Sequence, residues 1–132
     1  MIKKMDHIAI AVKDAEKAAK FYAEQLGIPV THVQEIAFDK VKVAFIPVGD
    51  SEIELVEPMD PQGGVATFIE RKGEGLHHIC FEVDNIDSEI KSLTEKGVQM
   101  IDKQARKGAA GMVAFIHPKS TGGVLIELAE KV

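Results

Sequence analysis

Strand-like and helix-like stretches follow one another in a fixed order along the first half of the chain. A β-type run at His7–Val12 precedes Ala15–Leu26, whose apolar residues recur at helical spacing and which stops at Gly27. Asp14, directly before this segment, is typical of a helix N-cap. Three further runs with the composition of strands follow, at residues 30–36, 41–48 and 52–56. The first half is therefore predicted to be β-α-β-β-β.

The second half repeats this order. A strand is predicted at His78–Val83, a helix at Asp84–Lys96 ending before Gly97, and three strands at residues 98–101, 112–117 and 124–128. Four landmarks recur 71, 70, 70 and 73 residues apart, in the pairs His7 and His78, Gly27 and Gly97, Phe45 and Phe115, and Glu54 and Glu127. Because polar and apolar landmarks recur in the same order, we infer a duplicated module.

The predicted fold class is α+β, with two tandem βαβββ modules. Residues 1–132 are interpreted as one domain, with module one at about 5–58, a linker at about 59–75 and module two at about 76–130. The linker contains apolar residues at helical spacing, which predicts a short helix within it.

Composition narrows the functional classes. No apolar run reaches the ~20 residues that cross a bilayer, and acidic Asp6 interrupts the N-terminal stretch before a signal peptide could form. The single cysteine fits a reducing compartment, so we expect a cytoplasmic protein. The net charge of −5 and the absence of a basic cluster on one face argue against nucleic-acid binding.

Four polar residues occupy matching places in the predicted strands. His7 and His78 open the first strand of each module, whereas Glu54 and Glu127 stand between apolar neighbours in the last strand of each. Each Glu alone could face solvent. A pseudo-two-fold axis would instead bring all four groups together, where they need a cation to coexist. Two imidazoles and two carboxylates suit Co²⁺, Mn²⁺, Ni²⁺ or Zn²⁺ better than Ca²⁺.

The motifs around these residues resemble the vicinal oxygen chelate superfamily, which includes glyoxalase I and extradiol dioxygenases, and within it the methylmalonyl-CoA epimerase family. The resemblance spans nearly the whole chain. The matching stretches are Asp6–Val12, Ile53–Pro58, Gly75–Asp84, Phe115–Lys119 and Gly123–Leu128.

This resemblance implies a curved mixed sheet around a central metal cavity, with His7, Glu54, His78 and Glu127 as ligands of one divalent ion, Co²⁺ first among the candidates. It implies interconversion of (R)- and (S)-methylmalonyl-CoA by 1,1-proton transfer through a metal-stabilised enolate. Glu127 is the candidate for one proton carrier. The second stays open between water, Glu54 and another group, because the strand at 41–45 has no Glu where some epimerases carry one.

An acyl-CoA substrate also needs partners for its phosphates. The basic stretch Lys103–Gly111 supplies Arg106, Lys107 and Gly108, and Lys119 is a further candidate; a solvated loop is the alternative interpretation. A glyoxalase I-type lactoylglutathione lyase and a non-catalytic small-molecule-binding protein are the alternative functions. A homodimer is expected by analogy with the family.

Overall fold

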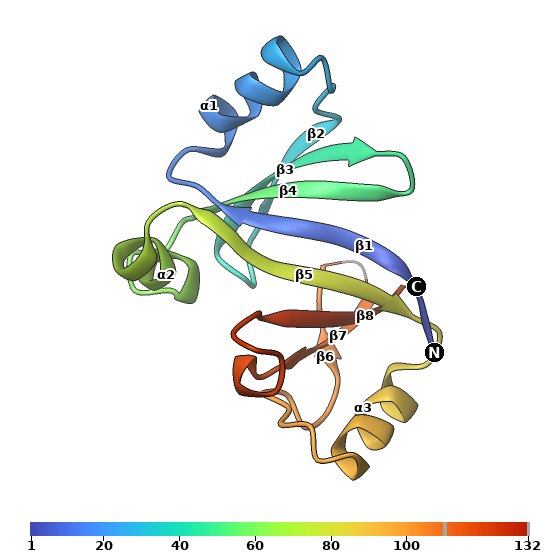
Figure 1. Ribbon diagram of the computed structural model, residues 1–132. Coiled ribbons are helices and arrows are strands. Elements are labelled where there is room, and N and C mark those ends of the chain that lie inside the picture. Colours follow the sequence, from blue (N-terminus) through green and yellow to red (C-terminus); the bar gives the residue numbers. More distant parts are fainter. Residues whose placement is uncertain (110, 132) are drawn as a thin grey trace. The chain divides into compact units, whose positions relative to one another are not determined.

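The protein is described by a computed structural model that covers residues 1–109 and 111–131 (Figure 1). Within this part of the chain, two compact units can be distinguished. One comprises His7–His77, and the other comprises Met1–Asp6 together with His78 onward. The strand β1 (Ile2–Ala11) therefore contributes its first residues to one unit and its last residues to the other.

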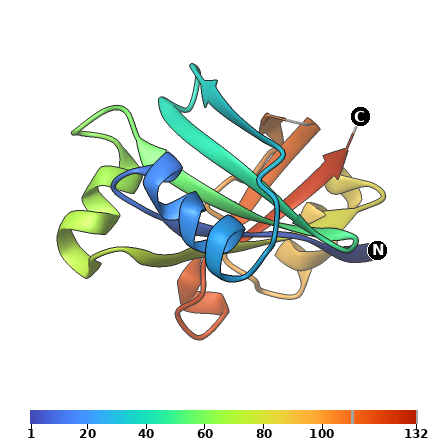
Figure 2. The same cartoon turned by 90° about the horizontal axis from the view of Figure 1, so that it is seen from above.

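The His7–His77 unit has a four-stranded mixed sheet in the order β2-β3-β4-β1. Strand β1 pairs in parallel with β4, and the other pairs are antiparallel. The elements after β1 are α1 (Ala15–Lys20), a π-helical turn (Phe21–Gln25), β2 (His32–Ile36), β3 (Val41–Val48), β4 (Ser51–Pro58) and α2 (Gly64–Lys72). Figure 2 shows α1 in blue with the green strands β3 and β4, whose residues share a core with it.

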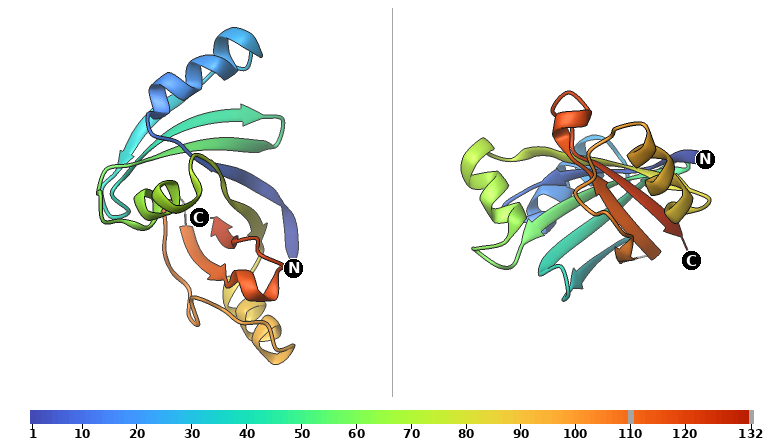
Figure 3. Two further views of the ribbon diagram at one scale, coloured as in Figure 1. Left: turned by 60° about the vertical axis from the view of Figure 1, so that its left-hand side comes forward. Right: turned by 90° about the horizontal axis from the view of Figure 1, so that it is seen from below.

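The other unit repeats this pattern in the order β5-β8-β7-β6, with β5 parallel to β8. Its elements are β5 (Gly75–Val83), α3 (Ile86–Glu95), β6 (Arg106–Lys107), β7 (Gly111–Ile116), a 3₁₀ turn (Pro118–Ser120) and β8 (Ile126–Lys131). Helix α3 packs on β7 and β8, and Figure 3 shows it in gold from two further sides. The α+β class and the two βαβββ modules are confirmed.

The two faces of each sheet differ in their side chains and in what packs against them. One face of each sheet carries the larger aliphatic side chains and packs against the helix of its module, with Leu55 and Ile46 in one unit and Leu128 and Ile116 in the other. The opposite face carries a smaller apolar cluster, which includes Val43 in one unit and Val113 in the other. Strand alternation places Glu54 and Glu127 on this second face.

The two helices that follow the first strand of each module begin in the same way. The side chains of Asp14 and Asn85 each accept a hydrogen bond of 3.0 Å from a backbone N–H three residues later, and both N-caps have φ −146° and ψ 104°. A glutamate from the last strand then accepts the next free N–H, from Glu57 to Ala15 N at 2.9 Å and from Glu130 to Ile86 N at 2.8 Å. The duplication therefore extends to the hydrogen bonds that start these helices.

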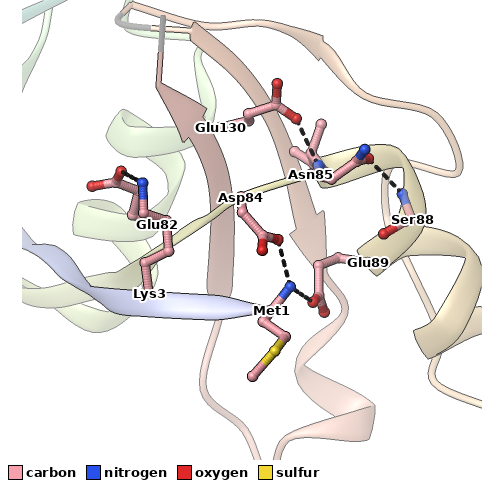
Figure 4. A network of polar contacts seen from close by, with 9 residues as sticks. Met1, Lys3, Glu82, Asp84, Asn85, Ser88, Glu89 and Glu130 are labelled. Carbon is pink, nitrogen blue, oxygen red and sulfur yellow. Dashed lines mark hydrogen bonds and ion pairs between the residues drawn. The ribbon is translucent and has the colours of Figure 1, made fainter.

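Residues Met1–Asp6 are bound to the second unit by ion pairs. The Met1 amino group lies 2.6 Å from both Asp84 and Glu89, and Lys3 lies 3.3 Å from Glu82 (Figure 4). These contacts raise the pKa of the Met1 amino group, chiefly through its hydrogen bonds to Asp84 and Glu89. They lower the pKa of Asp84, chiefly through its hydrogen bond to the amino group.

One predicted strand is wrong. Residues 98–101 form only an isolated bridge, between Met100 and Ile116, and the edge strand of this sheet is β6 at Arg106–Lys107. The ladder stops because the side chain of Asp102 accepts the backbone N–H of Phe115 at 2.8 Å, so that the chain turns away from β7. The predicted helix at 15–26 is also divided, since its second half forms the π-helical turn.

No helix among the described residues is long and apolar enough to cross a membrane.

Candidate metal centre

The His7–Glu54 pair belongs to the first unit. Strands β1 and β4 are neighbours in parallel register, with Ala9 opposite Glu54, and the His7 side chain reaches along the strand to the carboxylate. Nδ1 of His7 lies 3.2 Å from Oε2 of Glu54, and the two side chains are 10% and 17% exposed. The flanking residues Ile53 and Leu55 pack on the α1 side of the sheet. A polar pair is thus enclosed on the opposite face.

The His78–Glu127 pair repeats this arrangement in the second unit. Strands β5 and β8 are parallel neighbours, and Cys80, two residues after His78, is the register partner of Glu127. Nε2 of His78 lies 3.0 Å from Oε1 of Glu127, and the side chains are 12% and 13% exposed. The repeat therefore places an imidazole beside a carboxylate twice, once in each unit.

The chemistry of these two pairs fits a first-row divalent cation. Each pair offers an imidazole nitrogen and a carboxylate oxygen within hydrogen-bond distance of each other, at low solvent exposure. Burial of such groups away from water is costly unless a hydrogen bond or an ion compensates for it. Nitrogen and oxygen donors in equal number are the ligands that Co²⁺, Ni²⁺ and Zn²⁺ accept in proteins.

A phenylalanine stands beside the glutamate of each pair. Phe45 is the cross-strand partner of Glu54 and Phe115 that of Glu127. The ring of Phe115 also meets the His78 ring edge-on, with centroids 5.4 Å apart. Each carboxylate therefore has an aromatic residue as its neighbour on the adjacent strand.

The four residues proposed for substrate binding occupy different places in the second unit. Arg106 and Lys107 form β6, and Lys119 is exposed in the 3₁₀ turn between β7 and β8. Gly108 is buried, and a Cβ atom there would lie 2.7 Å from a methyl group of Val113. Gly108 therefore has a packing role in this unit.

Sequence reasoning missed Asp102, which shapes this region. One of its carboxylate oxygens accepts the N–H of Phe115, and the other lies 3.2 Å from Nε of Arg106. The spacing of four residues between Asp102 and Arg106 is a common ion-pair signal on helices, but here it lies in a loop, where the spacing alone carries little information.

Lys42 on β3 lies opposite Glu57 of β4 and is ion-paired. Its ammonium group pairs with Glu16 on α1, and this hydrogen bond raises the pKa of Lys42. The residue connects β3 to the helix on the α1 side of the sheet, away from the face of Glu54.

Comparison with known proteins agrees with this architecture. Residues 6–115 match the model of the Glyoxalase/Bleomycin resistance protein/Dioxygenase superfamily. Mitochondrial methylmalonyl-CoA epimerase of Homo sapiens is 40% identical over 129 residues, which cover 96% of this chain and 73% of the human protein.

Solved structures are similar over the full length. The hypothetical protein BH1468 from Bacillus halodurans has a TM-score of 0.94 and 41% identity, covering 98% of this chain and 94% of its own. A methylmalonyl-CoA epimerase in complex with methylmalonyl-CoA and NH4+ has a TM-score of 0.90 and 30% identity, covering 100% of this chain and 96% of its own. The fold, the duplicated histidine–glutamate pairs and these matches agree. The chain belongs to the Glyoxalase/Bleomycin resistance protein/Dioxygenase superfamily, and its relatives there include methylmalonyl-CoA epimerases.

Proposed function

We propose that the protein is a metal-dependent epimerase that interconverts (R)- and (S)-methylmalonyl-CoA. The observation that carries this proposal is the full-length similarity to methylmalonyl-CoA epimerases, with an enclosed histidine–glutamate pair in each module. The ion would be held by His7, Glu54, His78 and Glu127. Co²⁺ is our first candidate.

The reaction moves a proton at the carbon between the thioester and the carboxylate. Its difficulty is the negative charge that develops on the thioester oxygen next to an existing carboxylate. A divalent ion, when bound, supplies Lewis-acid stabilisation of that charge and a template for the substrate oxygens.

The chain's own residues would handle the proton. Glu127 is our candidate for one carrier, because its carboxylate is 13% exposed and its Oε1 lies 3.0 Å from Nε2 of His78. Phe115 on the adjacent strand is the register partner of Glu127 and contributes an apolar neighbour to this carboxylate. Inversion needs a carrier on the opposite face of the carbon as well, and Glu54 is the corresponding carboxylate of the other module.

The direct test is deuterium exchange at the α-carbon of methylmalonyl-CoA in deuterated water, with protein loaded with Co²⁺, Mn²⁺, Ni²⁺ or Zn²⁺. Wild-type protein should incorporate deuterium and lose this activity after chelation. Glu127→Gln should lower the exchange rate by about 10²- to 10⁴-fold, the usual contribution of a general acid–base group. Absence of exchange with every metal refutes the epimerase proposal.

A matched control separates chemistry from stability. Glu130 lies three residues later on the same strand, and its carboxylate accepts the first N–H of α3. Glu130→Gln makes the same chemical change and should leave exchange within about twofold of wild type at a temperature where both are folded. Equal losses in the two variants would remove Glu127 from the mechanism.

Two alternative functions are distinguished by the same protein preparation. A lactoylglutathione lyase would turn over the glutathione hemithioacetal of methylglyoxal and leave methylmalonyl-CoA unchanged. A binding protein without catalysis would turn over neither substrate and would contain no stoichiometric metal after gentle purification.

A further inference from the structure

Arg106 points to the same face of its sheet as Glu127. It is the register partner of Val113, which belongs to the cluster on that face together with Cys80 and Ala129. Its neighbour Lys107 pairs with Met112 and lies on the alternate face, toward α3. The two cations of β6 are therefore adjacent in sequence but opposed in direction.

The Arg106 side chain is held by two contacts. Its Nε lies 3.2 Å from Asp102, a carboxylate that is only 18% exposed and also accepts the Phe115 N–H. Its guanidinium group stands over the Phe115 ring at 5.5 Å. Because both contacts fix the plane of the guanidinium group, little rotamer freedom would be lost when it binds a ligand.

The terminal nitrogens of Arg106 have no further partner among the described residues, and the side chain is 47% exposed. Asp102 engages Nε alone, so the forked end with its two NH₂ groups stays open to solvent. A guanidinium end of this kind matches carboxylate and phosphate oxygens in a bidentate manner.

The open fork lies close to the His78–Glu127 pair. One face of Phe115 meets the guanidinium group of Arg106, and the same ring meets His78 at 5.4 Å. The Phe115 ring thus contacts both this cation and His78, all within one unit of the structure. Arg106 and Glu127 therefore lie on one face of the same sheet, with Phe115 next to both of them.

The first module lacks this cation. There the equivalent ring, Phe45, is stacked against the imidazole of His32 at 4.4 Å, and Gln34 is the register partner of Val43. The duplication therefore does not by itself require an arginine at this place. The carboxylate that orients it, Asp102, is likewise particular to the second module.

We propose that Arg106, oriented by Asp102 and Phe115, binds an oxyanion of the acyl-CoA substrate beside the His78–Glu127 pair. This inference rests on the proposed function and deepens it. The oxyanion is either the free carboxylate of the acyl group or a phosphate of the coenzyme A portion, which present the same chemistry to a guanidinium group. With a net charge of −5 the chain as a whole does not attract an anionic ligand, so a local cation such as Arg106 would favour its binding.

The test is calorimetric binding with three ligands to metal-loaded protein. Malonyl-CoA carries both oxyanions, propionyl-CoA carries only phosphates, and the malonyl thioester of N-acetylcysteamine carries only the carboxylate. Arg106→Gln should weaken binding of malonyl-CoA by about 10- to 100-fold, as expected for a charge-assisted hydrogen bond. The single-anion ligand that suffers the same loss identifies the source of the oxyanion.

Lys91→Gln is the matched control, since it removes one positive charge from an exposed residue of α3, which packs on the other face of the sheet. It should change all three dissociation constants by no more than about threefold. Arg106→Lys should recover part of the loss, because it keeps the charge but not the fork.

Equal effects of Arg106→Gln and Lys91→Gln, or no effect of Arg106→Gln on any ligand, would overturn the assignment. Failure of the proposed function is distinguishable from this outcome. If wild-type protein binds malonyl-CoA in an Arg106-dependent way but produces no deuterium exchange, the oxyanion site stands and the epimerase proposal falls. If exchange proceeds normally in Arg106→Gln with unchanged affinity, the opposite holds.

Discussion

Replacement of Glu130 by alanine should destabilise the second unit by removing a hydrogen bond at the start of α3. Its carboxylate accepts the Ile86 N–H at 2.8 Å in a partly buried place, directly after the N-cap residue Asn85. A hydrogen bond to a charged group contributes about 1.5–3 kcal/mol, and an anion at a helix N-terminus adds about 0.3–1 kcal/mol. We expect a loss of about 2 kcal/mol in the free energy of unfolding, because solvent can reach part of the vacated site.

Intermediate variants divide this loss into its parts. Glu130→Gln keeps an acceptor oxygen and removes the charge, so it should cost about 0.5–1 kcal/mol. Asn85→Ala removes the neighbouring cap and should cost about 1 kcal/mol. The stability losses of the two single variants should not be additive in the double variant, since both groups serve the same helix turn.

The assay is urea unfolding monitored by circular dichroism, with thermal melts as a second measurement. For a chain of this length, 1 kcal/mol corresponds to a shift of about 3–5 °C in Tm. Glu24, on the exposed turn after α1, provides a control at which alanine should change stability by less than about 0.5 kcal/mol. If Glu130→Ala and Glu24→Ala unfold at the same urea concentration, the capping role assigned to Glu130 is wrong.

Three further predictions concern pH, packing and metal. Because the pKa of Asp84 is lowered in the folded protein, its contribution to stability is present above the unfolded value of 3.8 and is lost as the pH falls through the lower folded value. Asp84→Asn should therefore make Tm depend less on pH in the acid range. An unchanged dependence would contradict this. Gly111→Ala should lower the free energy of unfolding by about 2 kcal/mol or more, because the new Cβ would lie 2.1 Å from the Glu130 carbonyl oxygen. Gly64→Ala, at the start of α2 with nothing within 4 Å, should be neutral or slightly stabilising. Equal melting temperatures of the two variants would refute this reasoning. Removal of metal with a chelator should lower Tm, and addition of Co²⁺ at 100 times its Kd should restore about 2.7 kcal/mol; a Tm indifferent to both would argue against a bound ion.

The hydrophobic pattern was sufficient to predict the order of the elements, because the strands that face the core show clear runs of apolar residues. The predicted bounds of β3 at Val41–Val48 agree with the structure residue by residue. The positions of Glu54 and Glu127 between aliphatic neighbours also predicted the face on which they lie, since alternation in a strand leaves few choices.

The edge of the second sheet could not be predicted in the same way. Strand β6 consists of two exposed cations, which give no alternation signal, whereas the apolar residues at 98–101 imitate a strand and pack into the α3 core through Val98 and Met100. The competing element was the side chain of Asp102, which replaces a backbone partner of β7. Local side-chain hydrogen bonds of this kind leave little trace in hydrophobic periodicity.

The division of β1 between the two units has a consequence for anyone who wishes to take the duplicated protein apart. A cut in the segment between the modules would leave Met1–Asp6 on the wrong fragment, since their partners Glu82, Asp84 and Lys131 all lie in the second half. The N-terminal fragment would then carry Met1–Asp6 without their partners, and the C-terminal fragment would lack this segment. A bipartite version of this protein should instead transplant the first six residues onto the C-terminal piece.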